Sequence, residues 1–322
     1  METYRSGEPE MGRSNLEVFS ETLQELADSD RDIVAVTSDS RGSGKIAPFG
    51  ERFPDRMIEV GIAEQNLVGV SAGLASAGKR VFAVSPACFL TARALEQIKN
   101  DVAYSDNPVN LIGISAGVSY GALGSTHHTL HDFATLRAIH NITIVSPADN
   151  FETRRSIELA AAYDHPVYIR LGKKPMPHLH DDQTKFEFGK GIVITEGEDL
   201  AIITTGECVH LASQAAIRLE RIHKIKTRVI SMHTIKPIDH KLLFQSATQC
   251  GSILTVEEHS LHGGLGEACA SLLMEAGFNV PFKMMGIPDE YTITGSQAEI
   301  LSHYRISETG IAEQAWDLIS QK

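Results

Sequence analysis

The chain has 322 residues, of which 42% are hydrophobic and 22% are charged, and its formal net charge is −12. This length and composition are typical of a globular protein with two domains of ordinary size, and the negative charge disfavours nucleic acid as a partner. No apolar run has the length of a membrane span, and the polar N-terminus does not resemble a signal peptide. Four widely spaced cysteines without a CxxC pair indicate reduced thiols, so we expect a cytoplasmic protein.

The first half of the chain alternates short apolar runs with helical patterns. Residues 1–12 are polar and are expected to form a flexible arm, and a capping box at 14–17 predicts the start of a helix. Continuous apolar runs, typical of strands buried on both faces of a parallel sheet, follow at 33–37, 57–60, 81–85, 109–115, 142–145 and 166–171. A helix is expected from about residue 90 to 104. The alternation predicts an open, doubly wound α/β domain over residues 13–172.

A second α/β pattern follows a segment that reads as a linker. Residues 173–188 contain two prolines, two histidines and an acidic pair, which is typical of a connection between domains. Residues 233–239 are expected to form a turn that leads into a helix. The strands are expected at 200–205, 227–232, 252–257 and 280–287. We therefore predict a second doubly wound domain over residues 189–322.

Glu64 is the first candidate for a functional residue. It follows the apolar run at 57–60 and begins a helix of small residues that includes Gly69 and Gly73. Because glycine is costly inside a helix, these two glycines predict that something packs closely against the helix backbone. A buried carboxylate needs a partner, and a cofactor would provide one. From the local sequence alone, stabilisation of Glu64 by the helix dipole is the simpler explanation.

A glycine-rich loop at 116–126 supplies further candidates, because it ends in a group of histidines. His127 and His131 could share a helical face and bind a metal, but histidines in loops more often orient a substrate or transfer protons. Phe89 follows the strand at 81–85, where an ordinary core aromatic is the default interpretation.

Three arginines are candidates for binding an anion. Arg170 lies at the carboxyl end of a predicted strand, which is where open α/β sheets bind their ligands. Arg13 and Arg93 complete the set, although a solvated surface charge explains each of the three equally well.

Taken in chain order, these features resemble the transketolase family. The motifs that carry the resemblance are GIAEQNLVGVSAGLASAG (61–78), GSTHHTLHDFATLR (124–137), IRLGKK (169–174) and HTIKPID (233–239). The resemblance runs from about Arg13 to the end of the chain. It corresponds to the last two of the three domains of a full-length transketolase, the pyrimidine-binding domain and the C-terminal domain. The chain has no GDG with a downstream Asn, the family motif for magnesium and diphosphate, and so resembles the second subunit of a split transketolase.

The resemblance implies a cofactor and partners. The cofactor is thiamine diphosphate, and its Mg²⁺ or Ca²⁺ ion is expected on the partner, an N-terminal diphosphate-binding subunit, with no metal on this chain. An α2β2 assembly is expected, in which this chain also associates with itself as a dimer. The implied reaction moves a two-carbon ketol unit between a ketose and an aldose, such as sugar phosphates.

The resemblance also implies roles for individual residues. Glu64 matches the glutamate that hydrogen-bonds N1′ of the thiamine pyrimidine, and Phe89 approximately matches the aromatic residue that stacks on that ring. Asp39 matches an acid near the thiazolium, and His127 matches the active-site histidine that contacts a substrate oxygen. The positions that hold the sugar phosphate are matched by Arg13, Ser43 and Arg170.

Two departures from the family pattern bear on the substrate. Leu123 stands where transketolases commonly have an aspartate that reads a substrate hydroxyl, and Ser115 stands where they commonly have a phosphate-binding histidine. An unusual sugar, branched or sulfonated, is therefore an expected possibility. The enzymatic alternatives are a relative of 1-deoxyxylulose-5-phosphate synthase and the β subunit of a 2-oxo acid dehydrogenase. A third alternative is a non-catalytic partner, and the presence of Glu64 and His127 argues against it.

Overall fold

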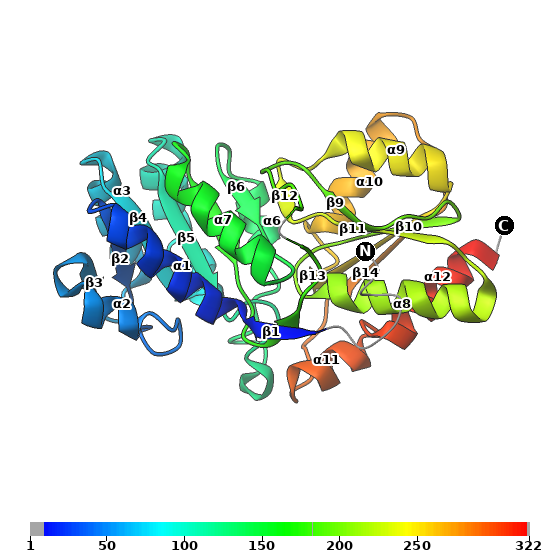
Figure 1. Ribbon diagram of the computed structural model, residues 1–322, viewed down its shortest axis with the longest axis horizontal. Helices are drawn as coiled ribbons and strands as arrows, with labels where there is room; N and C mark the ends of the chain where they lie inside the picture. The colour runs from blue at the N-terminus through cyan, green and yellow to red at the C-terminus, as the bar shows by residue number, and fades with distance from the viewer. Residues whose placement is uncertain (1–9, 182, 321–322) are drawn as a thin grey trace.

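Parallel strands buried on both faces form the larger of the two main sheets in this computed structural model, which describes residues 10–181 and 183–320 (Figure 1). The strand order is β12-β6-β7-β5-β4-β2-β3, and all neighbours are parallel except β12 and β6. The strands are β2 (Ile33–Thr37), β3 (Met57–Glu59), β4 (Arg80–Pro86), β5 (Val109–Ile114), β6 (Thr143–Val145), β7 (Val167–Arg170) and β12 (Thr234–Lys236). The expectation of a parallel sheet is confirmed.

Helices cover both faces of this sheet. Figure 1 shows α1 (Asn15–Ser29) and α7 (Asn150–Ala162) side by side, and both pack on one face together with alternate side chains of β2 and β4. The small-residue helix α3 (Glu64–Ser76) packs on the other face. The remaining helical segments are α2 (Ala47–Arg52), η1 (Pro54–Arg56), α4 (Ala87–Arg93), α5 (Leu95–Gln97), η2 (Ile98–Tyr104), η3 (Gly121–Leu123) and α6 (Asp132–Arg137). The expected doubly wound domain is thus confirmed.

The second sheet belongs to the C-terminal half and is also doubly wound. Its strand order is β14-β13-β10-β11-β9, with only β9 antiparallel to its neighbour. Its strands are β9 (Ile192–Thr195), β10 (Leu200–Thr204), β11 (Thr227–Ser231), β13 (Ile253–Ser260) and β14 (Phe282–Ile287). Its helices are α8 (Cys208–His223), α9 (His240–Cys250), α10 (Leu265–Glu275), α11 (Gln297–His303) and α12 (Glu308–Ser320). In Figure 1, α8 and α12 lie on one side of this sheet, and α9 and α10 lie on the other.

The segment 233–239, expected to be a turn, instead contains strand β12. It pairs antiparallel with β6 of the other sheet, with Thr234 opposite Val145 and Lys236 opposite Ile144. The expectation was wrong because three residues carry no strand periodicity of their own, and it is the free edge of β6 that orders them. The C-terminal half therefore completes the sheet of the first half.

The helix expected at 90–104 is also different, because it is broken. α4 ends at Arg93, Ala94 leaves the helical region with ψ 19°, and the chain restarts as α5 before continuing as the π-helical η2. All of these segments bury apolar residues against the same core, so the apolar spacing alone did not reveal the break. As a result, Arg93 lies at the end of a short helix.

The segment 173–188 connects the two halves, but it is held in place rather than free. It contains β8 (Pro175–Pro177), which pairs antiparallel with β1 (Met11–Ser14). Most of the expected N-terminal arm lies outside the described residues, and the part that is described enters β1.

The two remaining features of the described residues concern membrane-spanning helices and the state of the cysteines. No helix in the described part of the chain is long and apolar enough to cross a lipid bilayer. All four cysteines carry free thiols and are buried.

His180 fixes the connecting segment to the start of α7, where Glu152 in turn bonds the second half of the molecule. Its imidazole is 2% exposed, with Nδ1 3.0 Å from Asp149 Oδ2 and Nε2 3.3 Å from Glu152 Oε1. Burial alone would lower the pKa of His180, but the hydrogen bond with Asp149 and the charge of Glu152 raise it above its usual value. Glu152 also accepts a hydrogen bond from Ser231 Oγ at 2.6 Å, and this bond reaches the second sheet.

We expect His180→Ala to lower the free energy of unfolding by about 3 kcal/mol, because it leaves buried carboxylates without their partner. Because the folded pKa is raised, the contribution of the imidazolium is fully present below about pH 6.5 and is lost as the pH rises through the folded pKa. The destabilisation measured by urea unfolding should therefore shrink at higher pH.

The matched control is His165→Ala, which removes a half-exposed imidazole from Asp106. It should change stability by less than about 1 kcal/mol. Equal effects of the two substitutions would contradict the role given to His180.

Candidate active site

The predicted site residues other than Arg13, which lies in β1, are at one edge of the larger sheet, because its parallel strands end together. Asp39 follows β2, and α4 with Phe89 follows β4. The loop from 115 to 131 follows β5, and Gly172–Lys174 follow β7. This carboxyl edge is where open α/β sheets bind ligands.

Glu64 is buried at the start of α3, where it is paired with an arginine. Its side chain is 4% exposed, and Arg93 Nη1 lies 3.0 Å from both carboxylate oxygens. Arg93 is half exposed, so it approaches the buried carboxylate from the solvent side. The partner that a buried carboxylate requires is therefore supplied here by the chain itself.

Phe89 and His127 lie together beside this ion pair. The guanidinium carbon of Arg93 lies 4.4 Å from the centre of the Phe89 ring, and the His127 ring meets Phe89 edge-on at 5.3 Å. His127 meets Tyr120 in the same way at 5.4 Å, and Lys173 Nζ lies 4.8 Å from the centre of the Tyr120 ring. This row of contacts runs from Glu64 to the end of β7, and it offers aromatic faces and the cations of Arg93 and Lys173 to a planar, partly anionic ligand.

Asp39 lies in the turn between β2 and α2, near the start of α3. It has a left-handed conformation (φ 52°), which an aspartate adopts more readily than most residues. Its backbone N–H and that of Gly61 both donate to Glu59 Oε1, at 2.7 and 3.0 Å. Glu59 therefore ties the turn that carries Asp39 to the turn at Gly61, which leads into α3.

The other two histidines of the loop have structural partners. His128 is buried between Thr292 Oγ1 at 2.7 Å and the carbonyl of Gly121 at 2.9 Å, and burial lowers its pKa. His131 Nε2 lies 3.3 Å from Thr91 Oγ1. Among residues 10–181 and 183–320, no group of three or more His, Cys, Asp and Glu side chains is arranged to hold a metal ion.

The three residues matched to the sugar phosphate are not equally accessible. Arg13 is exposed and paired with Glu21, and Ser43 Oγ donates to the carbonyl of Ser40 at 3.4 Å. Arg170 is 6% exposed, and its Nε donates to Asp132 Oδ2 at 2.9 Å. Arg13 and Ser43 are thus within reach of solvent, whereas Arg170 is not.

Arg170 uses its remaining hydrogen bonds to join separate segments. Its Nη2 donates to the carbonyl of Glu258 at 2.7 Å and to that of Thr129 at 3.2 Å. These acceptors belong to β13 and to the histidine loop. Arg170 is therefore a buried link between the two halves of the chain.

Buried carboxylates hold the start of the same loop. Glu258 Oε1 accepts from Val118 N and from Gln297 Nε2, both at 2.9 Å. Gln297 Nε2 also donates to Glu207 Oε2 at 2.7 Å, and burial raises the pKa of Glu207 to about 7. The loop that carries His127 is thus positioned from the C-terminal half, including α11, which the sequence did not reveal.

The positions that depart from the family pattern differ in exposure. Ser115 is buried directly after β5 with φ 55°, and Leu123 is 56% exposed in η3.

The helix glycines do not meet the expectation of close packing within this chain. A Cβ atom added to Gly69 or Gly73 would meet nothing within 4 Å. The neighbouring Ile62 is 76% exposed. The surface of α3 around these two glycines is therefore open in this chain.

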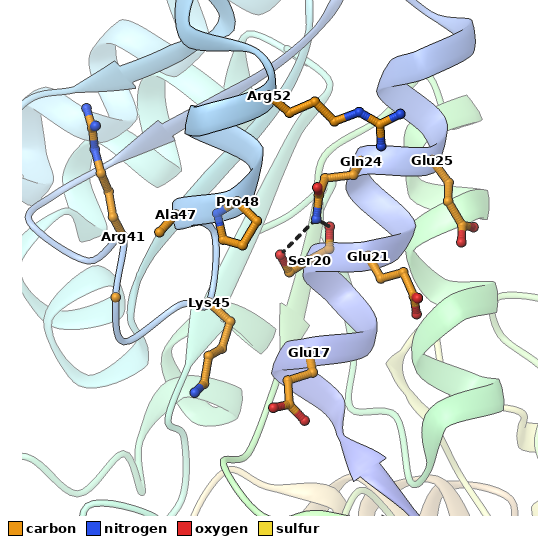
Figure 2. Close-up of a pocket in the computed structure, with 11 residues that line it drawn as sticks. Glu17, Ser20, Glu21, Gln24, Glu25, Arg41, Lys45, Ala47, Pro48 and Arg52 are labelled. Carbon is orange, nitrogen blue, oxygen red and sulfur yellow. Dashed lines mark hydrogen bonds between the residues drawn. The ribbon is translucent and has the colours of Figure 1, made fainter.

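A pocket of about 630 Å³ lies between α1 and the segment after β2 (Figure 2). Glu17, Glu21 and Glu25 come from α1, and Figure 2 draws them with cations from the other wall. The cations are Arg41, Lys45 and Arg52. The residues that line it do not include Glu64, Phe89 or His127, so this pocket is not the candidate site.

Sequence reasoning missed Tyr120 as a neighbour of His127, and Lys173 as a neighbour of Tyr120. Tyr120 and Lys173 are 53 positions apart, and only the pairing of β5 with β7 brings their loops together. The IRLGKK motif marked the strand end, but no local signal showed which of its cations reaches the site.

Comparisons with known proteins identify the two domains of the chain. The family descriptions "Transketolase, pyrimidine binding domain" and "Transketolase, C-terminal domain" match residues 12–177 and 189–311. The chain is 46% identical over 304 residues to a subunit of the apulose-4-phosphate transketolase of Phocaeicola vulgatus, covering 94% of this chain and 96% of that protein.

Two further relatives extend the comparison. The chain is 34% identical over 323 residues to the 1-deoxy-D-xylulose-5-phosphate synthase of Halothermothrix orenii, covering 98% of this chain but only 50% of that enzyme. A solved structure described as a split-gene transketolase in an inactive β4 tetramer has a TM-score of 0.88 and 35% identity. That match covers 96% of this chain and 99% of the other.

We expect Arg170→Lys to lower the free energy of unfolding of the chain without any sugar present, by about 2–4 kcal/mol, because lysine cannot reproduce the fork of buried hydrogen bonds. Urea unfolding of the isolated chain measures this loss. Arg13→Lys, at an exposed ion pair, is the control and should change stability by less than about 1 kcal/mol. Wild-type stability of Arg170→Lys would show that Arg170 is not a structural link.

Proposed function

This chain belongs to the transketolase family, and we propose that it is the pyrimidine-binding subunit of a split, thiamine diphosphate-dependent transketolase. The observation that carries the proposal is the buried carboxylate of Glu64 beside the face of the Phe89 ring. An aminopyrimidine needs these two features, a carboxylate to hydrogen-bond and an aromatic face to stack on. The relative named as one subunit of a transketolase, at 46% identity, supports the split arrangement.

The residues of this chain fit the pyrimidine end of the cofactor. Thiamine diphosphate, when bound, supplies a nucleophilic carbon that accepts the two-carbon unit of a ketose. Glu64 would hold the pyrimidine N1′ by a hydrogen bond, and Phe89 would stack on the ring. Asp39, in the turn tied to the start of α3, would lie on the thiazolium side. The diphosphate and its Mg²⁺ or Ca²⁺ ion would be held by the partner subunit.

His127 and nearby cations would bind the substrate. His127 is placed between two aromatic rings, and it would orient a substrate oxygen and transfer a proton there. Arg13 and Ser43, which reach solvent, would hold the sugar phosphate. We assign the cation at the end of β7 to Lys173, because Arg170 at the matched position is buried in other hydrogen bonds.

The substrate would be a ketose phosphate and an aldose. The name of the Phocaeicola vulgatus relative supports apulose 4-phosphate as the first candidate. Leu123 and Ser115, where the family pattern differs, support a sugar other than the usual one, with a sulfonated sugar as a further candidate. The alternative is a synthase that decarboxylates pyruvate, which the similarity to the deoxyxylulose-phosphate synthase supports, or the β subunit of a 2-oxo acid dehydrogenase.

The open face of α3 supports self-association. Gly69, Gly73 and the exposed Ile62 leave a surface to which a second copy of the chain could pack, in an α2β2 complex with the diphosphate-binding subunit. The four free, buried cysteines support a cytoplasmic location.

The test of function uses the complex reconstituted with the diphosphate-binding subunit, thiamine diphosphate and Mg²⁺. We expect two-carbon transfer to an aldose phosphate from at least one of three donors: apulose 4-phosphate, xylulose 5-phosphate or 6-deoxy-6-sulfofructose, the sugar in the name of a relative that is 32% identical to this chain. Glu64→Ala should reduce the rate by at least about 10²-fold. Its circular dichroism should remain that of the wild type.

Two outcomes would reject the proposal. Decarboxylation of pyruvate without ketol transfer would favour the synthase or the dehydrogenase subunit. A Glu64→Ala complex that keeps near wild-type activity would show that Glu64 does not serve the cofactor.

We expect the reconstituted complex to have the mass of an α2β2 assembly, as measured by light scattering. Gly69→Leu, which adds a bulky side chain to the open face of α3, should reduce self-association without unfolding the chain, because no atom of this chain occupies that space. A 1:1 heterodimer of the wild-type proteins would contradict the proposed assembly.

A further inference from the structure

Arg93 occupies the pyrimidine site, by which we mean the Glu64 carboxylate together with the face of the Phe89 ring. It follows Phe89 by four positions in α4, so both side chains lie on the same face of the helix. Its Nη1 donates to both oxygens of Glu64 at 3.0 Å, and its guanidinium carbon lies 4.4 Å from the centre of the Phe89 ring. One planar group therefore makes both contacts at once.

These are the two contacts that the proposed function assigns to the aminopyrimidine. A guanidinium and an aminopyrimidine protonated at N1′ are both planar, both can stack on an aromatic face, and both present an N–H donor to a carboxylate. The same oxygens and the same ring face cannot serve both groups. We propose that Arg93 is an internal substitute for the pyrimidine that closes this site in the unassembled chain and must leave when the cofactor binds.

The surroundings of Arg93 allow it to leave. Its side chain is 51% exposed, whereas that of Glu64 is 4% exposed. Arg93 is the last residue of α4, and the chain departs from helical geometry at Ala94. A half-exposed side chain at a helix end can rotate into solvent without moving the core.

Glu64 explains why a substitute is needed. A carboxylate this deeply buried is costly when it has no partner. The partner subunit and the cofactor are absent before assembly, so Arg93 satisfies Glu64 until the ring replaces it. In the unassembled chain, the contact between Arg93 and Glu64 would lower the apparent affinity for pyrimidine compounds, because only the fraction of molecules with an open site can bind them.

The experiment uses the isolated full chain and thiamine, which has the pyrimidine but lacks the diphosphate that the partner would bind. We expect Arg93→Ala to bind thiamine at least about tenfold more tightly than the wild type in isothermal titration calorimetry. The double variant Glu64→Ala/Arg93→Ala should lose this gain. Arg154→Ala, which removes an arginine paired with Glu25 on another surface, is the matched control and should bind as the wild type does.

Thiamine affinity in folded Arg93→Ala that is unchanged, weaker or too low to measure would overturn the proposal, as would a gain that persists without Glu64. If Arg93→Ala does not fold, Arg93→Lys decides. Lysine keeps a charge beside Glu64 but lacks the planar fork, so its affinity should lie above the wild type, and wild-type affinity would overturn the proposal.

The inference rests on the proposed function, and the two can fail separately. If the assembled complex binds thiamine diphosphate in a Glu64-dependent manner while Arg93→Ala leaves thiamine binding to the chain unchanged, only the role of Arg93 is wrong. If the complex shows no Glu64-dependent binding of thiamine diphosphate, the proposed function itself fails.

Discussion

The buried ion pair between Arg170 and Asp132 is the interaction on which the arrangement of the candidate site depends. It joins the end of β7 to the start of α6, and the same guanidinium bonds carbonyls of the histidine loop and of β13. Charges so deeply buried are tolerated only when every partner is in place. The loop that carries His127 therefore takes its position only when both halves of the chain are folded together.

The sequence was sufficient for those parts of the fold that local periodicity determines. The buried runs of β2 and β5 and the capping box of α1 were predicted because hydrophobic spacing and capping residues act within a few positions. Strand β12 and helix α11 were missed. The first depends on pairing with β6, and the second is short and lies far along the chain from the loop it supports.

The sequence supplied candidate site residues, but not the contacts between them. The pattern around Glu64 indicated a buried carboxylate in need of a partner, and Arg93 was noted only as a cation. Their pairing depends on how α4 lies across the start of α3, which neither segment specifies alone. Conversely, Arg170 was interpreted as a ligand-binding arginine because its strand-end position is visible in the sequence, whereas its burial is not.

Strand β12 belongs to the C-terminal half of the chain but to the sheet of the first half. The boundary between the two halves along the chain is therefore not the boundary between the two sheets in space. Thr234–Lys236 covers the edge of β6, so the pyrimidine-binding half, if severed from the rest, would present unpaired N–H and C=O groups along that edge. Such an edge pairs readily with strands of other molecules. The C-terminal half therefore acts as a built-in protection of the first half against aggregation, in addition to any part it has in the chemistry.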